Sequence, residues 1–171
     1  MNFIHSNGML GFVYRYECID KDGNVKWTMR EENLIPDVGR DYFLNAGLNG
    51  GTQYSTWYIG LYEANRTPVS ADTMTSLIAD CQESTSYTTT GNARLTLNDD
   101  ALSAGVWSNV GSPAEFTFTA SKTIYGGFVS SNATRSSTSG LLLSAVKNSS
   151  PKTIETGEIL RVTAGLSLIT A

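Results

Sequence analysis

The stretch that decides the fold, residues 33–62, reads NLIPDVGRDYFLNAGLNGGTQYSTWYIGLY. Pro36 closes an extended segment, and Asp37 is a good N-cap because its carboxylate can accept hydrogen bonds from the open amides of a first helical turn. A helix is predicted over residues 38–48, apolar on two sides and therefore packed under another element, as a plug that covers one end or edge of the fold. A glycine pair ends it, and residues 56–62 follow as a strand in the core. None of these residues is equipped for catalysis, so the stretch describes a scaffold.

The segments on both sides of this stretch are predicted as short strands. Apolar and polar residues alternate over residues 10–19 and again over residues 25–30, and residues 21–24 form the turn of the β-hairpin that joins them. Residues 68–78 are predicted as a connection with a one- or two-turn helix, capped by Ser70 or Asp72. Further strands are predicted at residues 83–90, 94–97, 106–110, 114–120, 123–131, 141–146 and 158–168, with a Ser/Thr-rich loop at residues 132–140. This pattern is typical of a β-sandwich or a β-barrel.

Length and charge limit the classes of protein to which the chain can belong. Its 171 residues predict one compact unit with an appended arm: residues 1–32 form an N-terminal arm and β-hairpin, and residues 33–171 form the β-sandwich domain. The formal net charge of -4, without a basic stripe, argues against nucleic-acid binding. No apolar run reaches the roughly 20 residues of a membrane span, and residues 1–11 lack the pattern of a secretory signal peptide. We therefore expect no membrane partner, folding in a cytoplasm, and reduced thiols at Cys18 and Cys81.

The chain carries no recognisable catalytic or cofactor-binding set. His5 is its only histidine and has no placed acidic or nucleophilic partner, which argues against a catalytic triad and against a histidine-based metal site. No phosphate-binding loop or dinucleotide fingerprint is present. Gly126 and Gly127 lie inside a strand pattern, where glycines favour a bulge or close packing. We expect a protein that is not an enzyme and that binds no cofactor and no metal.

One spacing is similar to that of a calcium-binding loop. Asp20, Asp22, Asn24 and Glu31 occupy its first, third, fifth and twelfth positions, but Val25 stands at the sixth position, where such a loop requires glycine. The flanking segments are also predicted as strands, whereas a calcium loop of this kind joins two helices. A plain hairpin turn is the favoured interpretation.

Aromatic residues offer one candidate binding surface. Trp57, Tyr58, Tyr62 and Trp107 could form a sugar-stacking platform, because flat rings on a rigid sheet suit that purpose. Their alternation with aliphatic residues favours a place in the core instead, where aromatic side chains contribute most to stability.

The hairpin offers a second candidate surface. Arg15, Lys26 and Arg30 could dock a protein partner, and the alternative is a solvated strand face whose charges protect the sheet edge. Residues 1–11 are a natural arm to become ordered on a neighbouring molecule, because such segments contribute contact area only when bound.

Several of these features occur together, in this order, in small structural proteins of tailed bacteriophages. They are the hairpin with its Asp22, Gly23, Asn24 turn and Trp27, the Asn33, Leu34, Ile35 segment, Gly39, the strand from Trp57 to Leu61, the strand with Gly126, Gly127 and Phe128, and the strand at residues 158–168. The chain resembles the capsid decoration, or cement, proteins of phage heads, and the resemblance covers most of its length. The length of residues 1–32 departs from the minimal module and extends it.

The resemblance implies a mainly β protein, a jelly-roll-like β-sandwich with an N-terminal hairpin and one short helix. It implies a structural virion protein, synthesised in the host bacterial cytoplasm, that binds the outer surface of a head as a dimer or trimer and clamps neighbouring major capsid subunits. The expected protein interface consists of His5, Phe12, Tyr14, Arg15, Lys26, Trp27 and Arg30. Two alternatives stay open: a tail, baseplate or fibre-associated protein, and a carbohydrate-binding β-sandwich module.

Overall fold

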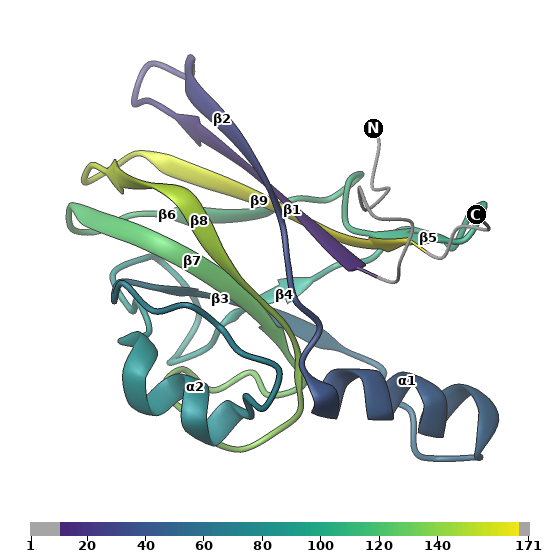
Figure 1. Ribbon diagram of the computed structural model, residues 1–171. Coiled ribbons are helices and arrows are strands. Elements are labelled where there is room, and N and C mark those ends of the chain that lie inside the picture. Colours follow the sequence, from purple (N-terminus) through teal and green to yellow (C-terminus); the bar gives the residue numbers. More distant parts are fainter. Residues whose placement is uncertain (1–10, 168–171) are drawn as a thin grey trace.

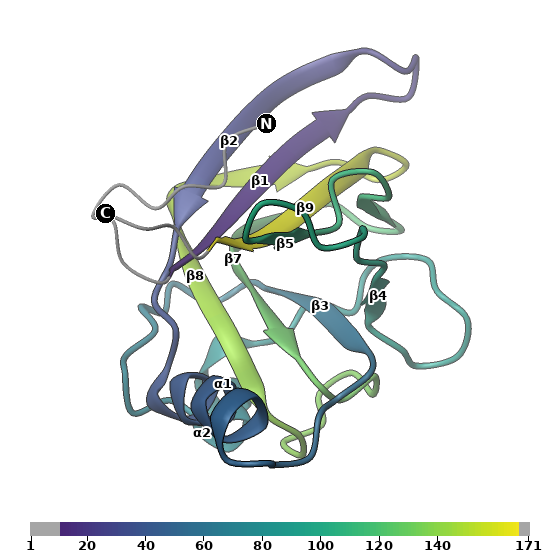
Figure 2. The same ribbon diagram turned by 90° about the vertical axis from the view of Figure 1, so that its right-hand side faces the viewer.

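Two antiparallel sheets lie face to face and form a sandwich-like fold (Figures 1 and 2). The computed structural model describes residues 11–167. The mainly β architecture predicted from the sequence is confirmed. The five-stranded sheet has the order β2 (Val25–Glu32), β1 (Gly11–Ile19), β9 (Ile159–Ser167) and β5 (Val106–Ser108), with β6 (Ala114–Thr117) also paired with β9. The four-stranded sheet has the order β4 (Leu95–Leu97), β3 (Trp57–Tyr62), β7 (Lys122–Ser130) and β8 (Leu142–Ile154).

The predicted N-terminal hairpin is present and forms one edge of the five-stranded sheet. β1 and β2 run antiparallel, with Arg15 opposite Arg30. The turn between them is held by Asp20, whose Oδ1 accepts hydrogen bonds from the backbone amides of Asp22 (2.9 Å) and Asn24 (2.8 Å). The segment whose acidic residues are spaced as in a calcium-binding loop therefore forms a hairpin turn, which aspartate side chains commonly stabilise.

The main core lies between the inner faces of the two sheets. Tyr14 and Tyr16 of β1 are 0% and 1% exposed, and their rings stack with centroids 6.2 Å apart. β9 pairs with β1 along its whole length and turns Leu160, Val162 and Ala164 into the same core. The alternation that predicted β1 is therefore real, because every second residue faces this interior.

α2 (Met74–Cys81) lies on the outer side of the four-stranded sheet, and α1 (Asp37–Leu48) lies at one end of the sandwich, where Tyr42 and Phe43 pack against the main core (Figure 1). A second apolar cluster fills the space between the helices and that sheet. Its members are Met74, Leu77 and Cys81 of α2, Tyr62 of β3, Phe128 of β7, and Leu142 and Ala145 of β8, with Val38 of α1 partly buried against them. Among the described elements, the five-stranded sheet is the one whose outer face no helix covers.

α1 corrects two expectations about its position. Asp37 is not its N-cap: the preceding proline holds that position, and Asp37 lies in the first turn, where it pairs with Arg40. The helix is also not buried on both of its apolar sides. Gly39 is buried, and Tyr42 and Phe43 pack against the main core, so α1 covers one end of the sandwich as expected, whereas Leu44 and Leu48 are 60% and 84% exposed. The second half of α1 therefore projects beyond the sandwich (Figure 1).

α2 is a second helix, whereas the predicted fold class had only one short helix. It begins later than the short helix expected within residues 68–78, and Thr73 caps it in place of Ser70 or Asp72. The Ser76 amide donates to the Thr73 hydroxyl (3.3 Å), and the Thr73 amide donates to the Ser76 hydroxyl (2.9 Å). This reciprocal pair is a capping box, which satisfies two amides at the start of the helix.

Residues 83–90 were predicted as a strand and form only isolated bridges, Glu83 with Tyr62 and Tyr87 with Phe118. Two buried arginines organise this region. Arg94 donates from Nε and Nη2 to the two carboxylate oxygens of Glu83, at 2.8 Å each. Arg135 lies 3.8 Å above the Tyr87 ring and donates to three backbone carbonyl groups. The pair of arginines fastens the predicted Ser/Thr-rich loop, residues 132–140, to the sandwich.

Candidate functional site

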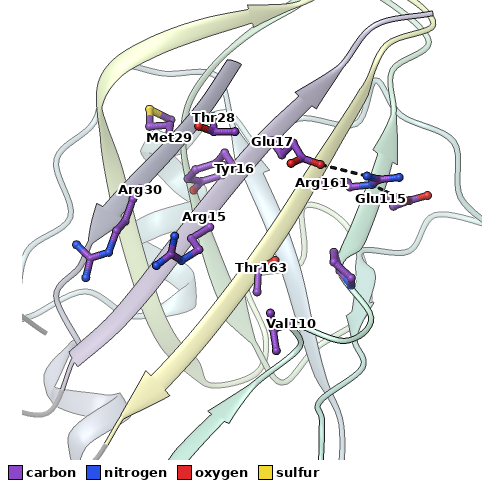
Figure 3. Close-up of a pocket in the computed structure, with 11 residues that line it drawn as sticks. Arg15, Tyr16, Glu17, Thr28, Met29, Arg30, Val110, Glu115, Arg161 and Thr163 are labelled. Atoms are coloured by element: carbon purple, nitrogen blue, oxygen red, sulfur yellow. Dashed lines mark hydrogen bonds and ion pairs between the residues drawn. The ribbon is translucent and has the colours of Figure 1, made fainter. Parts of the chain in front are cut away.

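The uncovered outer face of the five-stranded sheet contains a hollow of about 560 Å³ (Figure 3). Arg15 on β1 lies opposite both Arg30 on β2 and Thr163 on β9, so three strands bring these side chains into one row. Residues opposite each other in an antiparallel register share a face of the sheet. Val110 and Pro113, from the connection between β5 and β6, line the hollow from the side. The result is a polar concavity with arginines on its floor.

A row of charges borders this hollow. Arg161 on β9 donates from Nη1 to Glu17 Oε1 on β1 (3.1 Å) and from Nε to Glu115 Oε1 on β6 (2.6 Å), as the dashed lines in Figure 3 show. The hydrogen bond to Glu115 is the largest cause that raises the pKa of Arg161, and the hydrogen bond to Glu17 is the second. All three side chains are well exposed, so their network adds little to stability. It fixes the position of charges at the surface.

The structure divides the expected interface residues between the two faces of the hairpin. Arg15 and Arg30 line the outer hollow. Phe12 and Tyr14 face the core and are 0% exposed, so their side chains are not available at the surface of the folded chain. The alternation of a strand explains this division, because neighbouring residues point to opposite faces. His5 lies outside the described residues.

Lys26 and Trp27 lie at the bulge near the hairpin turn. Trp27 is half-buried and packs against the core, and Lys26 Nζ lies 2.5 Å from Glu158 Oε1. Burial alone would raise the pKa of Glu158. Hydrogen bonds from Lys26, from the Glu155 amide and from the Cys18 thiol outweigh that effect and hold the pKa below its ordinary value. Lys26 is thus committed to an ion pair within the fold.

The four aromatic residues considered as a sugar-stacking platform do not share one open face. Tyr62 is 0% exposed, and Trp57 is 8% exposed, so the core interpretation is confirmed for both. Tyr58 is half-buried on β3. Trp57 and Trp107 nevertheless line a second hollow, of about 300 Å³, beside α1. The sequence named two residues of that hollow but missed its other rings, which come from α1 and the loop after it.

The two cysteines are free and buried, and neither is a reactive thiol. Burial is the main cause that raises the pKa of Cys18 to about 12, and the charge of nearby Glu158 adds to it. Burial is also the main cause that raises the pKa of Cys81 to about 12, and the charge of Glu83 adds to it. Since the thiolate is the nucleophile, both side chains are inert at neutral pH.

Within residues 11–167, no set of three or more His, Cys, Asp or Glu residues is placed to hold a metal ion. No helix there is long and apolar enough to cross a membrane. No protein-family model matches the sequence, and no curated protein matches it significantly. The candidate site therefore stands on geometry alone.

Proposed function

We propose that this chain is a non-catalytic structural protein of a phage virion, which binds the outer surface of the head and stabilises contacts between major capsid subunits. The observation that carries the proposal is the unequal covering of the two sheets. Within residues 11–167, helices pack against the four-stranded sheet, whereas no helix covers the hollowed outer face of the five-stranded sheet (Figures 1 and 3). A rigid face of this kind suits binding to another folded surface.

The chemistry of the open face supports a protein partner. Arg15, Arg30 and Arg161 line the hollow together with threonines and two glutamates. Arginine is enriched at protein interfaces because its guanidinium group forms several hydrogen bonds and also covers apolar surface. Mixed charges fixed on a rigid sheet favour one complementary partner and one orientation over others.

The proposed mechanism is binding without chemistry. A protein that binds the assembled head and not its dissociated subunits shifts the equilibrium toward the assembled state by mass action. The proposal includes the jelly-roll-like topology, self-association as a dimer or trimer, a place on the outer capsid surface, and synthesis in the host cytoplasm. It involves no cofactor, nucleic acid or membrane.

The test uses purified protein and expanded heads that lack it. We expect the protein to sediment with heads and to raise the temperature at which they rupture. The double variant Arg15→Glu/Arg30→Glu should bind at least about tenfold more weakly, since each reversal removes about 1 kcal/mol of favourable interaction or more. Lys147→Glu, a charge reversal on β8 of the other sheet, is the matched control and should bind like the wild type.

Circular dichroism must first show that all variants are folded. Failure of the wild-type protein to bind heads, or binding to purified tails in place of heads, would overturn the proposed function. Equal loss of binding in Lys147→Glu and in the double variant would show that the open face is not the contact surface.

A further inference from the structure

The hollow beside α1 is built from aromatic rings that four separate elements supply. Tyr42 comes from α1, Tyr54 from the loop after it, Trp57 from β3 and Trp107 from β5. The Tyr42 ring centroid lies 5.5 Å from that of Tyr54 and 5.3 Å from that of Trp57, with tilted and edge-to-face geometry. Phe43, Leu143 and Leu166 complete an apolar lining. Rings from distant segments therefore converge on one concavity.

Tyr54 is the most informative member of the group because its ring is both exposed and fixed. It is 45% exposed, although apolar rings are usually turned inward when they can be. Its amide donates to the Tyr42 hydroxyl (3.0 Å), and its ring contacts Trp57 edge to face, with centroids 5.6 Å apart. An exposed ring held from two sides is preorganised, so a ligand would lose little entropy in ordering it.

The polar groups around the hollow define the class of ligand. Among residues 11–167, none of those that line it is charged, and residues 42–62 include no Asp, Glu, Lys, Arg or His. A phosphate or a carboxylate would therefore find no counter-charge in the lining. Gln53 offers an amide group, and Tyr42 and Tyr54 offer phenol hydroxyl groups. Aromatic faces with a few amide and hydroxyl groups suit a neutral ring that is apolar on one face and hydroxylated at its edge.

We propose that this hollow binds a neutral carbohydrate, with a pyranose ring stacked on Tyr54 and with a hydroxyl group directed to Gln53. The volume of about 300 Å³ lies at the lower end of ligand pockets and fits a short section of a glycan. This site is separate from the open face of the five-stranded sheet. The proposal does not rest on head binding, and the isolated protein is enough to test it.

Intrinsic tryptophan fluorescence and calorimetry provide the test, with cellohexaose, maltohexaose and chitohexaose as probes at concentrations up to about 10 mM. Because Trp57 and Trp107 line the hollow, binding of at least one probe should shift the emission and should saturate, with a dissociation constant of about 1 mM or below. Tyr54→Ala should weaken that binding about tenfold, whereas Tyr54→Phe, which keeps the ring, should retain most of it. Tyr58→Ala, which removes a half-buried ring of β3 outside the hollow, is the control and should bind normally.

Two outcomes would overturn the proposal. One is that none of the three probes binds the folded wild-type protein. The other is that a probe binds equally well to Tyr54→Ala, which would place the sugar elsewhere. If no probe binds and Tyr54→Ala instead loses head binding, the hollow belongs to a protein contact, and the carbohydrate proposal fails while the proposed function stands.

Discussion

Two glycines of α1 differ in what surrounds them, and the difference makes a matched experiment. A Cβ atom on Gly39 would lie 2.5 Å from the Leu143 carbonyl oxygen, so the helix would have to move away from β8. We expect Gly39→Ala to lower the free energy of unfolding by about 1–3 kcal/mol. Gly47 has no atom within 4 Å of the same position, and Gly47→Ala should raise that free energy by about 0.5–1 kcal/mol. Urea denaturation measures both, and equal effects would contradict the close approach of α1 to β8.

The burial of isolated charged side chains could not be predicted from the sequence. Arg94 and Arg135 stand alone among small polar residues, which is usually the mark of an exposed side chain. Their burial depends on Glu83, on Tyr87 and on backbone carbonyl groups from other segments. Such partners are brought together only by the fold. By contrast, Gly126 carried a local signal, and the register shift beside it confirms the expected bulge.

One buried carboxylate holds together the turn that leads into α2. Asp72 has a side chain only 2% exposed, and it accepts hydrogen bonds from two nitrogens of Arg66, at 2.8 and 2.6 Å. It also accepts from the Val69 amide (2.8 Å) and from the Ser76 hydroxyl (3.0 Å). Burial would raise the pKa of Asp72, but these bonds together outweigh it and lower the pKa below its ordinary value of 3.8.

This network predicts how stability depends on pH. A carboxyl group whose pKa is lower in the folded state stabilises the fold above its ordinary pKa, and that contribution is lost as the pH falls through the folded value. Asp72→Asn should therefore lower the free energy of unfolding at pH 7 by about 1–3 kcal/mol, and its difference from the wild type should shrink as the pH falls below the ordinary pKa of 3.8. Asp80→Asn removes a side chain that is 70% exposed and 3.8 Å from Arg66, and should change stability by less than about 0.5 kcal/mol. Denaturation at several pH values is the measurement, and a difference for Asp72→Asn that does not vary with pH would be inconsistent with this role.

Strands with a clear alternation of apolar and polar residues were predicted well. Segments whose structure depends on pairing with distant parts of the chain were not. Alternation correctly placed β1, β2, β6 and β9, and the hairpin turn had local chemistry. The threonine-rich residues 83–90 have the propensity for a strand but only isolated bridges in the structure, which shows that propensity alone does not make a sheet. β8 continues to Ile154, well past the expected residue 146, because a bulge interrupts its period while β7 still pairs with it.

In the whole molecule, the order of the strands in the five-stranded sheet brings together the residues of the candidate face. The sequence indicated that Arg15 and Arg30 share one face of the hairpin, because a short turn fixes their register. It gave no indication that Thr163 and Arg161 of β9 lie beside them, since the pairing of β1 with β9 joins segments far apart in the chain. Local chemistry could therefore identify half of the candidate face, and the fold supplies the rest.

The central place of β9 also determines how this protein must fold. β9 lies between β1 on one side and β5 and β6 on the other, and it brings Leu166 opposite Phe12. A fold dominated by such distant pairs reaches its native state slowly, so we expect refolding from urea over milliseconds to seconds. Stopped-flow tryptophan fluorescence follows it, and complete recovery in microseconds would contradict this expectation.

During synthesis, the ribosome makes the hairpin long before β9, the strand that pairs with the other edge of β1. Until β9 has been made, β1 keeps an unpaired edge, and an unpaired strand edge on an unfinished sheet favours aggregation. The yield of native protein in the cell should accordingly depend on elongation rate and on chaperones as much as on the stability of the finished fold.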